Sequence, residues 1–262
     1  MTRVIRAELF RLVRRRTMLM AAGGAAVFST VATLAVFASA RSADAPPTRG
    51  GTTVDALAGG GGGTEAFAVG ASFVGFLVFV TFIALIAGEL SGGTFRALLL
   101  RDPHRLRVIV GKLLGILLVA AAIIAAAEAG SFVVSLLVAP TKDISTSAWF
   151  SLEGIGGGLR DYATVLGGVA GWAVFGTTLS VVLRSVPLAL GVGFAWAGPF
   201  ETIVVDSWST GHRVFPGRVL ASRIQGGTAA LALGRAVLTA ARYAAAAAAV
   251  SLLVVSRRDV TA

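Results

Sequence analysis

Long uninterrupted runs of apolar residues constrain the fold of this chain more than any other feature. Each of six segments is long enough to cross about 30 Å of hydrocarbon, which takes about 20 helical residues. These segments cover approximately residues 17–40, 66–88, 113–139, 162–183, 187–205 and 236–255. Continuous apolar runs favour helices over the alternating strands of a membrane barrel. The sequence therefore predicts an all-α membrane protein with six transmembrane helices, a transmembrane domain over residues 17–262.

The composition agrees with this fold and excludes several kinds of function. Of the 262 residues, 56% are hydrophobic and 14% are charged, whereas a soluble domain has about 25% charged residues. The absence of cysteine excludes disulfides, thiolate metal sites and cysteine nucleophiles, and no metal site is predicted. We attribute the net charge of +10 to basic membrane-protein loops, so no nucleic-acid partner is predicted. The excess of Arg over Lys, with abundant Ala and Gly, indicates a bacterial genome rich in G and C.

Basic residues concentrate in the connections on one side of the predicted membrane. Residues 1–16, residues 89–112, the turn at Arg184 and the C-terminal end carry fourteen Lys and Arg residues, and the opposite loops carry seven. The positive-inside rule then places both termini in the cytoplasm of a multi-pass protein in the bacterial plasma membrane.

The N-terminal segment, residues 1–16, has an amphipathic pattern. Ile5, Leu9 and Leu12 share one helical face and arginines occupy the other, which predicts a helix lying in the membrane interface. A basic anchor that only sets topology is the alternative. The span that follows ends in Ala38-Ser39-Ala40, a pattern similar to a signal-peptide cleavage site. Its apolar region of about 23 residues is long for a signal peptide, so we expect a membrane span.

Two loops on the predicted outer side differ in character. Residues 41–65 contain five consecutive glycines, 59–63, and we expect a mobile linker. Residues 206–230 are apolar for a solvated loop, which predicts an outer re-entrant segment. The glycine-rich stretch at 154–159 does not complete a dinucleotide-binding pattern, and we expect a flexible outer loop there.

Residues 89–112 form a compact basic connection between the second and third spans. Gly92-Gly93 permits a sharp turn, and Thr94 can cap a short helix. Asp102 followed by Pro103 starts a new helix that continues into the third span. The prediction is a short helix parallel to the membrane and rigidly coupled to two spans, an element able to transmit displacement.

This connection also carries a resemblance to a known family. The stretch from Glu89 through Gly93-Thr94, Arg96, Pro103 and Arg105 to Gly111-Lys112 resembles the motif of ABC-2 type transporter permeases. The N-terminal segment resembles the elbow helix that opens such permeases. The resemblance implies that 89–112 is a cytoplasmic coupling hairpin. The residues implied to contact the ATPase partner are Glu89, Gly93, Thr94, Arg96, Arg101, Pro103 and Arg105.

The resemblance implies partners as well. A second permease subunit, identical or related, would complete the membrane domain, and a separate nucleotide-binding subunit would hydrolyse ATP with Mg. The chain itself has no complete P-loop, so neither an enzyme activity nor a cofactor is predicted for it. Many members of the family export drugs, antibiotics or lipids. We therefore expect export of a hydrophobic or amphipathic compound, although the residues alone define neither substrate nor direction.

Other functions remain open at this point. A secondary transporter or a non-transporting structural membrane subunit is the alternative. An intramembrane enzyme is disfavoured because the sequence contains neither H-E-x-x-H nor G-x-S-x-G.

Some residues within the spans invite a functional interpretation. The ionisable residues Glu128, Glu201 and Arg242 reach a similar predicted depth, so Arg242 either pairs with one glutamate or all three extend separately to the headgroups. Trp172 and Trp196 lie mid-span, where they either line a substrate groove or pack against protein and lipid. Glycines in spans four and five, including those at 167, 168 and 171, predict close packing of these two spans.

Overall fold

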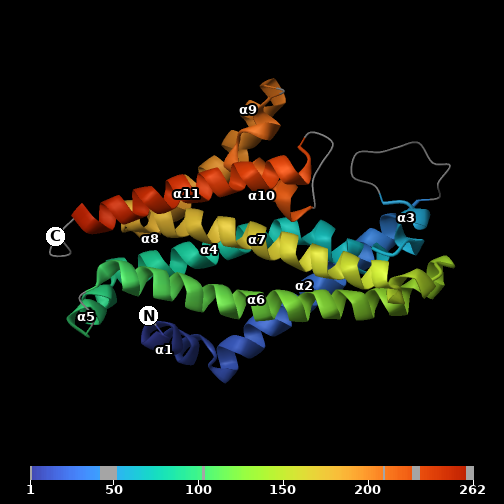
Figure 1. The fold of residues 1–262 in the computed structure, drawn as a ribbon, viewed down its shortest axis with the longest axis horizontal. Helices are drawn as coiled ribbons and strands as arrows, with labels where there is room; N and C mark the ends of the chain where they lie inside the picture. The colour runs from blue at the N-terminus through green and yellow to red at the C-terminus, as the bar shows by residue number, and fades with distance from the viewer. Residues whose placement is uncertain (1, 42–51, 102–103, 209, 226–230, 258–262) are drawn as a thin grey trace. The chain divides into compact units, whose positions relative to one another are not determined.

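The computed structural model describes residues 2–41, 52–101, 104–208, 210–225 and 231–257, and within these ranges the chain is almost entirely helical (Figure 1). The described part contains no sheet, and an isolated bridge joins Arg41 and Thr53. The α-helices are α1 (Thr2–Leu12), α2 (Arg15–Ser39), α3 (Val54–Ala58), α4 (Gly62–Ser91), α5 (Thr94–Arg101), α6 (Arg105–Val138), α7 (Leu152–Leu183), α8 (Val186–Ala195), α9 (Glu201–Ser207), α10 (Pro216–Ile224) and α11 (Leu233–Arg257). The 3-10 helices are η1 (Ala139–Lys142), η2 (Ser147–Phe150) and η4 (Gly211–Arg213), and η3 (Trp196–Phe200) is a π-helix.

The chain divides into two compact units, each with its own core. Unit 1 consists of Met1–Leu12, Phe73–Val119 and Gly167–Ala262, and unit 2 of Val13–Ser72 and Ala120–Leu166. Helices α4, α6 and α7 therefore each contribute residues to both units.

Four helices in the described part are long and apolar enough to cross a membrane. They are Met18–Ser39, Arg105–Lys142, Leu152–Leu183 and Leu233–Arg257. They coincide with the first, third, fourth and sixth predicted spans and support an all-α membrane protein. The six-span topology stays a prediction, because Leu77–Ser91 and Val186–Ala195 are shorter apolar helices.

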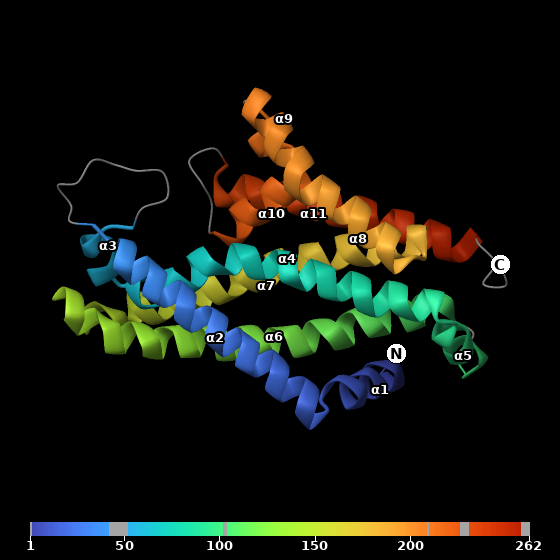
Figure 2. The same ribbon diagram turned by 180° about the vertical axis from the view of Figure 1, so that it is seen from behind.

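The core of unit 1 consists of two clusters of apolar side chains. One joins α4, α6 and α7 through the buried residues Phe82, Ile86, Ile116 and Ala173. The other joins α5, α6, α7 and α11 through the buried residues Phe95, Val108, Ile109, Val181 and Val255. Helix α10 packs against α11 (Figure 2).

The segment predicted as span five, 187–205, is divided in the structure. Helix α8 has only ten residues, about 15 Å of rise. The π-helix η3 and the short helix α9 follow it. Pro199 lies in η3 and has no main-chain N–H to donate to the carbonyl four residues earlier, which favours this break.

Unit 2 is built around a cluster that includes Phe37, Leu57, Ala66 and Trp149. The indole Nε1 of Trp149 donates a 2.8 Å hydrogen bond to the carbonyl of Leu57. The hydroxyls of Thr33 in α2 and Ser131 in α6, both buried, lie 2.8 Å apart. These contacts fix α2, α3 and the second half of α6 within one core.

The glycine runs differ from the predicted flexible loops. The residues at 62 and 63 begin α4, and the stretch 154–159 lies in the first turns of α7. A Cβ at Gly63 would lie 2.6 Å from the ring of Phe132, and a Cβ at Gly154 would lie 2.3 Å from the carbonyl oxygen of Trp149. These glycines permit close packing, which requires a missing side chain and not a mobile backbone.

Candidate functional site

The predicted coupling connection has a defined path in unit 1. Helix α4 ends at Ser91, and α5 begins at Thr94 after Gly92-Gly93. Gly93 has a φ of +75°, a conformation that favours glycine. The hydroxyl of Thr94 donates a 3.2 Å hydrogen bond to the carbonyl of Glu89. The turn therefore links the end of α4 directly to the start of α5.

Helix α5 is held at one side and exposed at the other. Phe95, only 5% exposed, packs with α6, α7 and α11. Leu100 is 89% exposed, and Thr94 is exposed as well. Figure 1 shows α5 between the adjoining ends of α4 and α6. Phe95 thus anchors the helix in the core of unit 1, and Leu100 remains exposed on its other side.

The structure describes three of the remaining four predicted contact residues. Arg96 and Arg101 lie on α5. Pro103 lies outside the described residues. Arg105 begins α6, and its Nη1 donates a 3.4 Å hydrogen bond to the carbonyl of Val255 in α11. The base of the connection is thereby joined to the C-terminal helix.

A network of four charged side chains lies directly behind this connection. Lys112 Nζ in α6 donates a 2.8 Å hydrogen bond to Glu8 Oε2 in α1 and a 2.9 Å hydrogen bond to Glu89 Oε1 in α4. Lys112 Nζ also lies 2.7 Å from Glu89 Oε2. Arg11 donates to Glu8 and to Glu89 from the same helix as Glu8. Opposite charges therefore alternate around the network and connect three helices.

Burial makes this network unlike an ordinary surface ion pair. The side chains of Lys112 and Glu8 are each 5% exposed and that of Glu89 is 12% exposed, whereas Arg11 is 40% exposed. Helix α1 approaches α6 closely because position 115 is glycine, where a Cβ would lie 2.9 Å from the Cβ of Glu8. Removing one partner would leave its buried neighbours uncompensated.

The sequence prediction named Glu89 but missed its partners. Glu8 is the one acidic residue before Asp44, and Lys112 is one of two lysines. The rarity of acidic residues near the N-terminus and of lysines in the whole chain was the signal that could have drawn attention to Glu8 and Lys112. It does not reveal the contact, because 104 residues separate Glu8 from Lys112.

The predicted intramembrane charges have separate surroundings. Glu201 is 1% exposed and accepts hydrogen bonds from the main-chain N–H groups of Gly217, at 3.0 Å, and Arg218, at 3.1 Å. These groups open α10, whose N-terminus favours a negative charge. Arg242 in α11 is exposed, and the described part of unit 1 contains no ion pair between Arg242 and Glu201. The pairing of Arg242 with either glutamate stays a prediction.

The two mid-span tryptophans have different surroundings. Trp172 is 4% exposed and packs 5.1 Å, centroid to centroid, from Phe79. Trp196 is 40% exposed and stacks on Phe200 at 4.9 Å. Trp172 is therefore a core residue of unit 1, whereas Trp196 can still contact a ligand or lipid.

The predicted close-packing glycines of α7 do approach another element. A Cβ at Gly168 would lie 2.2 Å from Ile224, and one at Gly171 would lie 2.4 Å from Leu220. Their neighbour is α10, from the predicted re-entrant segment. The predicted approach of spans four and five occurs instead at Gly193 of α8, where a Cβ would lie 3.2 Å from Leu179 of α7.

No group of three or more His, Asp or Glu side chains able to hold a metal occurs in the described ranges. Comparisons with known protein families, curated proteins and solved structures find no match to this chain.

Proposed function

We propose that this membrane protein is the permease subunit of an ATP-binding cassette exporter, driven by a separate ATPase. The observation that carries the proposal is the way α5 is attached to the rest of unit 1. Phe95 anchors α5 in the core, and Glu89, just before α5, belongs to a buried charge network. The resemblance of residues 89–112 to the ABC-2 coupling hairpin adds to it.

The physical argument concerns the transfer of force. A helix held by one buried aromatic residue and joined to its neighbours by short turns moves together with them. Displacement of α5 by a partner would move the end of α4 and the start of α6, and the contact between Lys112 and Glu8 would carry that motion to α1. The exposed Leu100 supplies an apolar contact for the partner.

In the proposed assembly, two permease subunits, identical or related, form the pathway. Each subunit has six spans, with both termini in the cytoplasm of a bacterial cell. ATP and Mg bind to the partner ATPase. The cargo is a hydrophobic or amphipathic compound that moves outward.

The test is co-expression with an ATPase encoded beside this chain, followed by purification and measurement of ATP hydrolysis. We expect the ATPase to co-purify with the native chain. Leu100→Asp should lower its recovery about tenfold, because a charge replaces an apolar contact. The double variant Glu89→Ala/Arg96→Ala, assayed on the folded fraction after size-exclusion chromatography, should lose the stimulation of ATP hydrolysis by cargo.

Lys142→Ala is the matched control, because Lys142 is an exposed basic residue in η1 of unit 2. It should leave ATPase recovery unchanged. Purification of the chain alone, with no ATPase encoded nearby, would refute the permease and favour a secondary transporter or a structural subunit.

A further inference from the structure

Unit 2 contains a cavity of about 630 Å³ between the second half of α6 and the first half of α7. This volume lies within the range of small-molecule sites, about 300–1,000 Å³. Residues that line it include Glu128, Phe132, Trp149, Phe150, Leu159 and Tyr162. Phe150 is 62% exposed and Leu159 68% exposed, so the cavity is accessible from one side.

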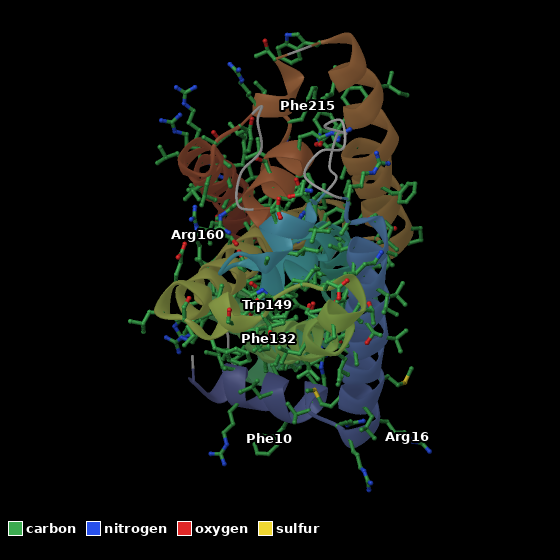
Figure 3. All side chains as sticks on the ribbon, turned by 90° about the vertical axis from the view of Figure 1, so that its right-hand side faces the viewer. Phe10, Arg16, Phe132, Trp149, Arg160 and Phe215 are labelled. Carbon is green, nitrogen blue, oxygen red and sulfur yellow. The ribbon has the colours of Figure 1, made fainter. Side chains whose placement is uncertain are left out.

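Aromatic rings form much of the cavity wall. The centroid of Phe132 lies 6.0 Å from that of Trp149 and 5.8 Å from that of Phe150, the latter in an edge-on arrangement. Figure 3 shows Phe132 and Trp149 close together. The faces of such rings carry negative electrostatic potential and attract cations.

The cavity also contains an uncompensated carboxylate. Glu128 lines it, and within the described ranges no cationic side chain forms an ion pair with Glu128. A Cβ at Gly158 would lie 3.7 Å from Glu128 Oε1, an ordinary contact distance, so this carboxylate lies beside the backbone of α7.

Two further acidic residues lie near the cavity. Asp161, whose Oδ2 accepts a 2.7 Å hydrogen bond from Thr64 in the cavity wall, repels Glu128. Burial raises the pKa of the Glu65 carboxyl, in the first turn of α4, and repulsion from Asp161 raises it further, so Glu65 holds its proton more readily than an exposed glutamate. Arg160, which attracts Asp161, is exposed.

We propose that this cavity binds a lipophilic organic cation, with Glu128 as its counter-ion and the aromatic rings as its walls. A neutral apolar molecule would leave the carboxylate unpaired, and an anion would be repelled by it. An inorganic cation would gain nothing from the apolar walls. A compound with one delocalised or quaternary positive charge and an aromatic body satisfies both parts of the lining.

Binding here goes beyond the proposed permease function and does not depend on it. If that function also holds, the bound cation belongs to the class of compound carried.

The experiment is equilibrium binding of radiolabelled tetraphenylphosphonium to the purified full-length chain in a neutral detergent. Tetraphenylborate, which has nearly the same shape and the opposite charge, serves as the competing ligand. We expect saturable binding of the cation and little competition by the anion. Glu128→Gln should weaken binding about tenfold, because it removes the counter-ion while keeping the side-chain shape.

Two further variants separate charge from folding. Glu153→Gln removes one negative charge from an exposed position on α7 outside the cavity lining, and it should leave binding unchanged. Ala129→Trp places a large side chain at an exposed lining position and should block binding while keeping Glu128. Thermal unfolding and size-exclusion chromatography would establish that each variant is folded.

Three results would overturn the inference. They are the absence of saturable binding to the native chain, equal weakening by Glu128→Gln and Glu153→Gln, and binding of tetraphenylborate as tight as that of the cation. The recovery of the ATPase partner tests the permease separately, so either proposal can fail while the other stands.

Discussion

Replacing Lys112 by methionine removes the cation at the centre of the buried charge network and keeps most of the side-chain volume. Glu8 and Glu89 then remain, each losing a contact of less than 3 Å to Lys112 Nζ. Arg11 still contacts both carboxylates, but it is 40% exposed, so solvent screens its contribution. The variant therefore leaves two buried carboxylates with only partial compensation.

The expected loss of stability follows from these distances. With an effective dielectric constant of about 20, each close contact with Lys112 contributes roughly 6 kcal/mol of attraction. Most of this attraction is offset by the desolvation of the charges. Breaking a buried ion pair by removing one partner destabilises proteins by about 3–5 kcal/mol, which is the loss expected for Lys112→Met.

The assay is equilibrium unfolding of the purified protein in mixed micelles by a denaturing detergent, followed by tryptophan fluorescence. The native chain, Lys112→Met, Glu8→Gln and the double variant form a double-mutant cycle. The double variant should lose about 1–3 kcal/mol less than the sum of the two single losses, because each single change already breaks the shared contact.

Lys142→Met is the control, since Lys142 is exposed and outside the network, and its loss should stay below about 0.5 kcal/mol. Additivity of Lys112→Met and Glu8→Gln within about 0.5 kcal/mol would refute the reasoning, because it would mean that the two residues are not energetically coupled.

Three other predictions can be tested in the same unfolding assay. Glu201→Gln should destabilise the chain by about 1–3 kcal/mol, because an amide cannot accept from both N–H groups at the start of α10, and an equally stable variant would contradict this. Trp149→Phe should cost about 1–3 kcal/mol through the unpaired carbonyl of Leu57, and a smaller loss than about 0.5 kcal/mol would show that water or another group replaces the indole. Gly168→Ala should destabilise the chain by about 1–3 kcal/mol, because the added Cβ overlaps Ile224. Gly156→Ala on the same helix meets open space and should stabilise the chain by up to about 1 kcal/mol. A change of the same sign in both variants would contradict the packing of α10 on α7.

Glycine shows where reading the sequence alone is ambiguous. A glycine lowers backbone order in a loop but also lets two elements approach within contact distance, and its neighbours decide which property matters. At 92–93 the turn was predictable, because two consecutive glycines follow a long apolar run and precede a short helix-forming stretch. At 59–63 and 154–159 the same residue type led to an expectation of mobile loops, and the structure uses Gly63 and Gly154 in these runs for close packing.

The charged residues also show which features can be predicted from a local motif and which depend on contacts between distant segments. Glu89 was identified from its place in a local motif, whereas Glu8 and Lys112 acquire their importance only from each other. Glu128 was recognised as a costly charge in an apolar run, but the aromatic wall around it is assembled from α6, η2 and α7 and could not be predicted from any one of them.

The sequence by itself determined the all-helical character, the membrane class, the positions of the longest apolar helices and the short helix after Gly93. These properties depend on hydrophobic runs and turn residues within about 20 positions of one another, so local composition suffices to predict them. Only the tertiary structure decided that Lys112 joins Glu8 to Glu89, that α10 occupies the glycine face of α7, and that Glu128 faces a cavity with aromatic walls. Those arrangements depend on the packing of segments far apart in the chain, and no short stretch of residues specifies which side chains will meet.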